Sequence, residues 1–112
     1  MSDPENFEKL RLELRRGAIV LAVLGQLQKE HYGYSLRKAL INQGLSIDEG
    51  TLYPLIRRLE KQGLLASEWR EEDKRRKRFY RISSEGRDVL NRLHEEWSHL
   101  DSIVTSTLKE RM

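Results

Sequence analysis

The chain of 112 residues contains no cysteine. This absence excludes a disulfide framework, a zinc site built from thiolates and a cysteine nucleophile. The composition fits a cytoplasmic protein, and we expect it to use no cofactor and no metal. His94 and His99 are five residues apart, so a helix would place them on different faces, and we interpret them as surface histidines.

Long apolar segments are also missing. The apolar run at residues 18–24 has seven residues, which is far too short to span a bilayer. Arg15 and Arg16 precede it but no small-residue cleavage site follows, so we interpret the run as a buried helix and not as a signal peptide. A helix that is apolar on nearly every side must be covered by the rest of the domain or by another subunit. We expect no contact with a membrane.

The signatures of common enzymes are absent from the sequence as well. It has no nucleophile elbow, no Gly-rich loop for phosphate and no zinc-protease motif. The seven glycines are scattered at the expected helix ends and turns. We therefore predict that the protein is not an enzyme.

Positive charge, in contrast, is concentrated in one part of the chain. Residues 50–81 carry 10 Lys and Arg against 5 Asp and Glu, whereas residues 1–49 carry 7 of each and residues 82–112 carry 4 against 6. The net charge of +3 therefore arises in the middle segment. A local basic excess of this kind favours one nucleic-acid face over general basicity.

The start of this basic segment, residues 50–63, has the pattern of an amphipathic helix. Its apolar residues recur at i, i+3, i+4 and i+7, namely Leu52, Leu55, Ile56 and Leu59. The opposite face carries one proline and three cations, namely Pro54, Arg57, Arg58 and Lys61. Taken alone, this pattern fits a helix that binds a polyanion, and it equally fits a surface helix with a solvated basic side.

The ends of this predicted helix have their own signals. Ser46, with Glu49 three residues later, predicts a capping box, and Gly63 can end the helix in a left-handed conformation. Pro54 cannot donate a hydrogen bond to residue 50, so the helix should begin near Gly50 or bend in its first turn.

Two earlier helices are predicted, at residues 7–28 and 34–41, with residues 1–6 frayed. Residues 31–33 form the short connection between them. Because the helix at residues 34–41 and the basic helix follow closely after one another with a glycine in the turn, they predict a helix-turn-helix.

Two short runs after the basic helix predict a β-hairpin. Residues 65–70 and 77–82 are rich in aromatic and β-branched side chains, and the charged residues 71–76 lie between them as a tip. The five consecutive cations at residues 74–78 outnumber the three acids that precede them. We interpret the tip either as a solvated basic loop or as a wing that reaches across the phosphate backbone of a nucleic acid.

The C-terminal segment predicts a long helix with one apolar seam. Ser83 or Ser84 caps it. Apolar residues follow at spacings of 3, 4, 3 and 4, namely Leu90, Leu93, Trp97, Leu100 and Val104. Because so small a chain leaves little apolar surface to cover this seam, we predict a two-fold symmetric homodimer in which the first helix shares the interface. Packing against the first helix of the same chain is the alternative.

Three segments of the sequence, residues 32–36, 50–63 and 78–87, resemble motifs of the PadR family of bacterial transcription regulators in their order and gaps. The resemblance covers about residues 11–104. It implies a winged-helix fold in which residues 50–63 form the DNA-recognition helix.

The fold class expected from this resemblance and from the patterns above is mainly α with a small β-hairpin (α+β). We expect one domain over residues 1–112. Within it, a winged helix-turn-helix occupies residues 7–82 and a dimerisation helix occupies residues 83–112.

The resemblance also implies a dimeric regulator, in the usual case a repressor, that binds an inverted-repeat operator in double-stranded DNA. The recognition helix would enter the major groove, while the wing and the second helix would contact phosphates. Thr51, Tyr53, Pro54 and Arg57 are expected nearest the bases. The complete set of expected DNA-binding residues is Tyr34, Ser35, Lys38, Thr51, Tyr53, Pro54, Arg57, Arg58, Lys61, Lys74, Arg75, Arg76, Lys77 and Arg78.

Residues 96–101 resemble a stretch of the multidrug-sensing PadR members with a short C-terminal region. In those proteins paired tryptophans at the dimer interface sandwich flat aromatic compounds. The resemblance implies a small-molecule site formed by Trp97, Asp101, Ala18 and Ala22, where the carboxylate would favour planar cations. Alternatively, Trp97 only fills the dimer interface, and the sequence leaves both interpretations open.

Two other hypotheses about binding also remain. The winged helix could be a protein-interaction module whose basic face is incidental. RNA binding is less favoured because the aromatic residues Tyr53, Trp69, Phe79 and Tyr80 offer no sheet platform on which bases stack. Binding to heparin or duplex DNA, with its salt dependence, distinguishes the regulator from the interaction module.

Overall fold

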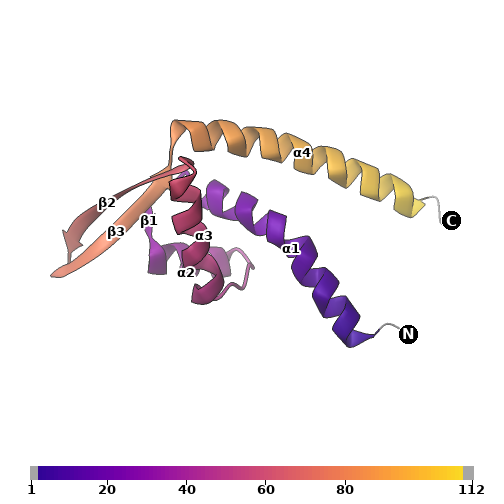
Figure 1. The fold of residues 1–112 in the computed structure, drawn as a ribbon, viewed down its shortest axis with the longest axis horizontal. Helices are drawn as coiled ribbons and strands as arrows, with labels where there is room; N and C mark the ends of the chain where they lie inside the picture. The colour runs from indigo at the N-terminus through magenta and orange to yellow at the C-terminus, as the bar shows by residue number, and fades with distance from the viewer. Residues whose placement is uncertain (1–2, 110–112) are drawn as a thin grey trace.

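The computed structural model describes residues 3–109. Within these residues the elements follow in the order α1 (Pro4–Gln26), β1 (His31–Tyr32), α2 (Gly33–Asn42), α3 (Glu49–Lys61), β2 (Leu65–Glu72), β3 (Arg75–Ile82) and α4 (Ser84–Lys109). This order confirms the predicted α+β class. Figure 1 shows the hairpin of β2 and β3 projecting from one side of a small helical body, while α1 and α4 extend from the other side.

The core lies where α2, α3, the sheet, the last turns of α1 and the first turns of α4 meet. Its buried residues are Val23, Leu24, Leu27, Leu36, Leu40, Ile47, Leu52, Leu55, Ile56, Leu59, Leu65, Tyr80, Ile82 and Leu90. All four apolar residues predicted for the inner face of α3 belong to this core. Of the apolar run at residues 18–24, Val23 and Leu24 are buried, whereas residues 18–22 stay partly exposed in the single chain.

The first helix begins earlier than its apolar pattern indicates. Residues 4–6, predicted to be frayed, are helical because Asp3 caps them: its Oδ1 accepts a hydrogen bond of 2.9 Å from the N–H of Glu5. Pro4 occupies the start of the helix, where its missing N–H costs nothing. Residues 1 and 2 lie outside the described residues.

The predicted capping box before α3 is wrong. Asp48 is the N-cap, and its Oδ1 accepts a hydrogen bond of 2.8 Å from the N–H of Thr51. Ser46 instead uses its carbonyl oxygen, which accepts a hydrogen bond of 2.8 Å from the Arg15 guanidinium. The helix begins at Glu49, one residue before the expected start, and Pro54 lies inside it.

The sheet is antiparallel in the order β1-β3-β2. The predicted hairpin is confirmed, with Leu65 opposite Ile82 at its base and Glu72 opposite Arg75 at its tip. The connection predicted at residues 31–33 is wrong, because His31 and Tyr32 form β1 and pair with β3. A strand of two residues is too short to produce an alternating pattern in the sequence.

The tip of the hairpin is tighter than the predicted six-residue segment. Only Asp73 and Lys74 lie between the strands, with φ angles of 54° and 64°. Two consecutive left-handed residues are typical of a two-residue type I′ turn. The charged side chains around them therefore stand on paired strands and not on a flexible loop.

The start of α4 packs closely against the segment after α3. Ser83 fulfils one of the two predicted caps, since its Oγ accepts a hydrogen bond of 3.0 Å from the N–H of Gly86. A Cβ added at Gly86 would lie 2.0 Å from the carbonyl oxygen of Leu64 and 2.8 Å from Cγ1 of Ile82. Only glycine permits this approach of α4 to the core.

We expect Gly86→Ala to lower the free energy of unfolding by about 1–3 kcal/mol, because the backbone of residue 64 must move. Gly50→Ala is the matched control, since an added Cβ there meets nothing within 4 Å. Urea denaturation followed by circular dichroism gives both values. Equal stability of the two variants would contradict the packing described for α4.

Candidate functional site

The outer face of α3 is cationic, as predicted. Pro54, Arg57, Arg58 and Lys61 are exposed, and the apolar stripe on the other side of the helix holds them there. Thr51, near the start of the helix, is exposed as well. Hydrogen bonds from Thr51 lower the pKa of the Asp48 carboxyl at this end of the helix, with the larger effect from the Thr51 side chain and the smaller from its backbone. The capping carboxylate therefore stays ionised and complements the positive end of the helix dipole.

Tyr53 has a part in packing as well as a predicted place near the bases. Its ring lies against α2, where a Cβ added at Gly33 would be 3.1 Å from Cε1 of Tyr53. Burial, followed by the nearby Glu49 carboxylate, raises the pKa of the Tyr53 phenol. The close approach of α2 to α3 thus depends on this glycine and this ring, and the phenol remains a neutral hydrogen-bonding group.

Ser35, predicted to contact phosphate, uses its hydroxyl inside the protein. The Oγ donates to the carbonyl oxygen of Tyr32 at 3.1 Å, accepts from the N–H of Tyr32 at 3.2 Å, and lies 3.0 Å from Nδ1 of His31. Burial, with Lys29 adding to it, lowers the pKa of His31. Of the residues on α2 that were predicted to contact DNA, Tyr34 and Lys38 are exposed.

The five cations of the predicted wing fall into two groups. Lys74, Arg75 and Arg76 are exposed at the tip, whereas Lys77 and Arg78 are half-buried. Lys77 lies 3.6 Å from the Glu72 carboxylate, and its ammonium is 4.3 Å from the centroid of the Tyr32 ring.

Arg78 connects the wing to α3. Its Nη2 lies 2.7 Å from Oε1 of Glu60, and its Nε donates to Oγ of Ser67 at 2.9 Å. The Ser67 hydroxyl donates in turn to the other oxygen of Glu60. These contacts give Arg78 a structural role, and the phosphate contact expected of it stays a prediction.

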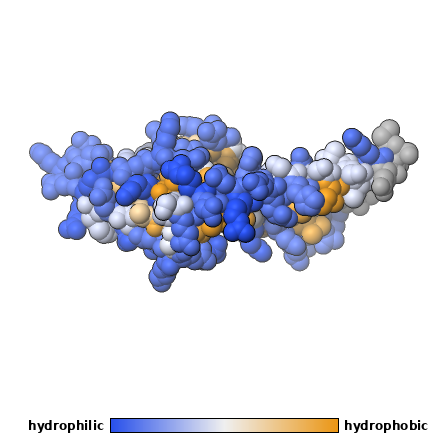
Figure 2. Space-filling view, turned by 90° about the horizontal axis from the view of Figure 1, so that it is seen from above, coloured by the Kyte–Doolittle hydropathy of each residue, from blue (hydrophilic) through white to orange (hydrophobic). Residues whose placement is uncertain are grey.

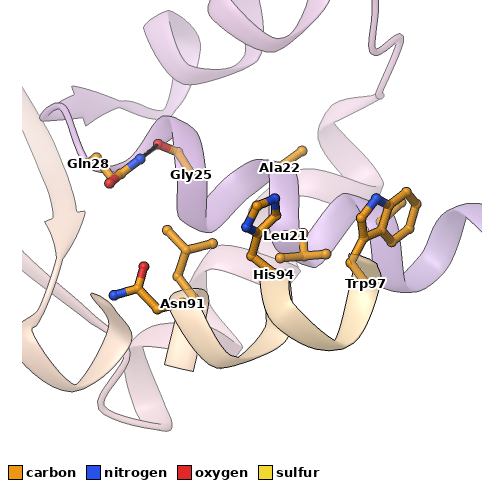
Figure 3. Close-up of a pocket in the computed structure, with 9 residues that line it drawn as sticks. Leu21, Ala22, Gly25, Gln28, Asn91, His94 and Trp97 are labelled. Atoms are coloured by element: carbon orange, nitrogen blue, oxygen red, sulfur yellow. Dashed lines mark hydrogen bonds between the residues drawn. The ribbon is translucent and has the colours of Figure 1, made fainter. Parts of the chain in front are cut away.

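A second candidate site lies between α1 and α4. A cavity of about 710 Å³ there contains three of the predicted contact residues, Ala18, Trp97 and Asp101. A smaller neighbouring cavity of about 410 Å³ contains Ala18, the fourth predicted residue Ala22, and again Trp97. Figure 3 shows the smaller cavity, with His94 and Trp97 rising from α4 beside α1.

The seam of α4 is exposed along most of its length. From Leu93, at 36% exposed, to Val104, at 53%, its side chains face solvent in the single chain. Leu90 differs from the prediction, because it is 9% exposed and belongs to the core of its own chain. Figure 2 shows apolar side chains at the surface over the end of the molecule that α1 and α4 form.

Comparison with known proteins identifies the family. Residues 20–92 match the family described as the transcriptional regulator PadR-like family. The chain belongs to the PadR family. The predicted resemblance is therefore confirmed, and this PadR-family protein is a transcriptional regulator that acts on DNA and not an enzyme.

Individual relatives agree with this assignment. A PadR-family regulator of known structure from Eggerthella lenta is 44% identical, with a TM-score of 0.86 and 93% of each chain covered. A transcriptional regulator from Mycobacterium tuberculosis is 40% identical over 79 residues, which are 70% of this chain and 74% of that protein. A transcriptional regulator from Clostridium thermocellum is 30% identical, with a TM-score of 0.75 and coverage of 84% of this chain and 96% of that one.

Neither a membrane-spanning helix nor a cluster of metal ligands occurs in the described part of this PadR-family chain. Among residues 3–109 no helix is long and apolar enough to cross a membrane. The same residues contain no group of three His, Cys, Asp or Glu side chains that could hold a metal ion.

Some residues at the two sites of the PadR-family chain were not found from the sequence. Trp69 is 53% exposed on β2, where its ring lies 5.3 Å from the Arg76 guanidinium. Gln28 and Asn91 line the smaller cavity together with His94, which the sequence indicated only as a surface residue. A signal existed for Trp69, since it stands in the strand opposite the basic run, but an isolated amide in the turn after α1 and another on α4 give none.

We expect Arg78→Gln to destabilise the PadR-family fold by about 1–2 kcal/mol, because Glu60 loses the partner of a charge-assisted hydrogen bond. Arg76→Gln is the matched control and should change stability by less than about 0.5 kcal/mol. A double-mutant cycle with Glu60→Gln, measured by denaturant unfolding, should recover a coupling energy of about 1 kcal/mol. Zero coupling would remove this ion pair from the account of the wing.

Proposed function

We propose that this PadR-family protein is a dimeric, sequence-specific DNA-binding repressor whose inducer is a planar aromatic small molecule. The observation that carries the proposal is the position of exposed cations on consecutive elements. Arg57, Arg58 and Lys61 stand on α3, while the wing tip at residues 74–76 carries three more. A cationic helix and a cationic hairpin next to it in the chain suit a groove and its flanking phosphates.

The residues of the proposed DNA interface form two groups, one that contacts bases and one that contacts phosphates. The first turns of α3 bring Thr51, Pro54 and Arg57 to the base edges, where an arginine can bind guanine through two hydrogen bonds. The exposed cations near the end of α3, on α2 and at the wing tip contact phosphates and set the register of the protein on the duplex.

The dimer is proposed from apolar surface that one chain leaves uncovered. The exposed large apolar residues on α1 and α4 are Phe7, Leu10, Leu12, Leu14, Leu93, Trp97, Leu100, Ile103, Val104 and Leu108. So many exposed apolar side chains on two neighbouring helices indicate an interaction surface, and a second copy of the chain is its natural cover. Two-fold symmetry would then present two α3 helices to an inverted repeat with half-sites about one helical turn apart.

The small-molecule site is proposed for the larger cavity between α1 and α4. Leu14, Leu21 and Leu100 supply its apolar walls, Trp97 offers a ring face, and Asp101 supplies a negative charge. A flat compound held there would press α1 and α4 apart. Because the same helices carry the dimer surface, a change in their separation would alter the spacing of the two recognition helices and weaken operator binding.

We expect the triple variant Lys74→Gln, Arg75→Gln, Arg76→Gln to weaken binding to a mixed-sequence DNA duplex. The slope of log K against log salt should fall in magnitude by about 2–3, because each lost phosphate contact removes about 0.9. Arg87→Gln with Arg92→Gln is the control, since both residues are exposed on α4, outside the proposed interface. Fluorescence anisotropy at several salt concentrations measures the slope, and an unchanged slope would remove the wing from the interface.

We expect the unmodified chain to sediment as a dimer at micromolar concentration and Leu100→Asp to sediment as a monomer. The substitution would bury an unpaired carboxylate at the seam, which costs several kcal/mol of association free energy. Ser102→Asp, exposed on the same helix, introduces the same charge two residues away and should leave the dimer intact. A folded monomer of the unmodified chain would contradict the proposed assembly.

A further inference from the structure

The two cavities between α1 and α4 meet at one ring. Both are lined by Ala18 and Leu21 of α1 and by Trp97 of α4, so they are neighbouring compartments on either side of the Trp97 side chain. Their remaining lining residues differ in chemistry. This difference defines the kind of molecule that could occupy both compartments at once.

The larger cavity, which we name the acidic compartment, has three carboxylates in its lining. These are Glu13 of α1 together with Glu96 and Asp101 of α4, and among residues 3–109 no Lys or Arg lines the cavity. Its other walls are mostly aliphatic. Carboxylates at the edge of an apolar slot favour an organic cation, because the apolar walls exclude part of the water that would screen the attraction between the charges.

The smaller cavity, which we name the amide compartment, has neutral polar groups at the other side of Trp97. Gln28, Asn91 and His94 line it, and in the part of the chain that the structure describes neither a carboxylate nor a Lys or Arg does. Nε2 of Gln28 donates to the carbonyl oxygen of Gly25 at 3.1 Å, which fixes the side chain and leaves its Oε1 as an acceptor (Figure 3). The amide of Asn91 offers both a donor and an acceptor.

The wall of the amide compartment on α1 is shallow. Ala18, Ala22 and Gly25 recur at i, i+4 and i+7, and a Cβ added at Gly25 would meet nothing within 4 Å. Facing them, Trp97 and His94 stand one turn apart on α4 (Figure 3). Small residues opposite two flat rings leave a slot suited to another flat ring, with polar groups at its far end.

We infer that the effector is a two-ended planar molecule. Its aromatic ring lies beside Trp97, its cationic group enters the acidic compartment, and a neutral hydrogen-bonding substituent such as a carboxamide enters the amide compartment. This inference rests on the proposed small-molecule site, which already expects a planar cation, and adds the neutral hydrogen-bonding end. It explains why polar side chains that differ so sharply in charge lie at opposite sides of one tryptophan.

The test uses two matched probes, 1-methylquinolinium and 1-methylquinolinium-6-carboxamide. Both are planar cations, and they differ only in the neutral amide. Affinities are measured by calorimetry with the full chain and by fluorescence with Trp69→Phe, in which Trp97 is the single remaining tryptophan. We expect the carboxamide to bind roughly 2- to 10-fold more tightly than the parent cation, as one or two added hydrogen bonds provide.

Variants assign this preference to one compartment. Asn91→Leu should abolish the preference for the carboxamide, measured as the ratio of the two affinities. Asn42→Leu, an identical change at an exposed residue at the end of α2, should retain the preference. Asp101→Asn should weaken both probes by a similar factor, because both carry the cation.

The outcomes separate this inference from the proposal on which it rests. If both probes quench Trp97 with equal affinity, or Asn91→Leu keeps the preference for the carboxamide, the two-ended effector is overturned and the site for planar cations stands. If neither probe binds the full chain or quenches Trp97, the proposed small-molecule site fails, and the inference fails with it.

Discussion

The inward packing of one apolar stripe on α3 is the constraint on which the rest of the structure depends. Leu52, Leu55, Ile56 and Leu59 are all buried in the core, and each contributes about 1.5–3 kcal/mol relative to exposure. Because a helix repeats every 3.6 residues, fixing this stripe also fixes the opposite face. Rotating the helix by one residue would expose leucine and bury an arginine, so the same packing that stabilises the fold presents Arg57 and Arg58 to solvent.

The wing depends on α3 through Glu60, a charge that lies outside the exposed cationic face of the helix. Glu60, on the flank of α3, accepts hydrogen bonds from Arg78 of β3 and from the Ser67 hydroxyl of β2. These contacts fix the base of the hairpin against the helix, while the turn at Asp73 and Lys74 closes its tip. A count of charges in the sequence cannot separate the two groups, since cations that stabilise the hairpin and cations that remain exposed are consecutive residues in one strand.

Patterns that repeat along several turns were predicted correctly from the sequence, whereas several features set by one or two residues were not. The stripe of α3 and the hairpin emerged because many residues agree on one period. The cap of α3 did not, because Ser46 and Asp48 are both good capping residues and only the backbone conformation selects between them. The ion pair of Arg78 with Glu60 joins residues 18 apart, and the amide compartment combines Gln28, in the turn after α1, with Asn91 of α4. Such contacts depend on how elements pack, which no local pattern contains.

The two long helices connect the proposed effector site to the DNA-binding part by continuous structure. Near its C-terminal end α1 contributes Val23 and Leu24 to the core, and in its first turns α4 contributes Leu90. Residues 19–22 of α1 are partly buried and pack against the same core, whereas the larger cavity and the exposed apolar surface lie along the outer parts of the two helices. A close-packed interior resists deformation, so a ligand that separates the outer parts of α1 and α4 must tilt them about their buried ends. The buried ends share one core with α3, and in the proposed mechanism a change at Trp97 would reach α3 through this core.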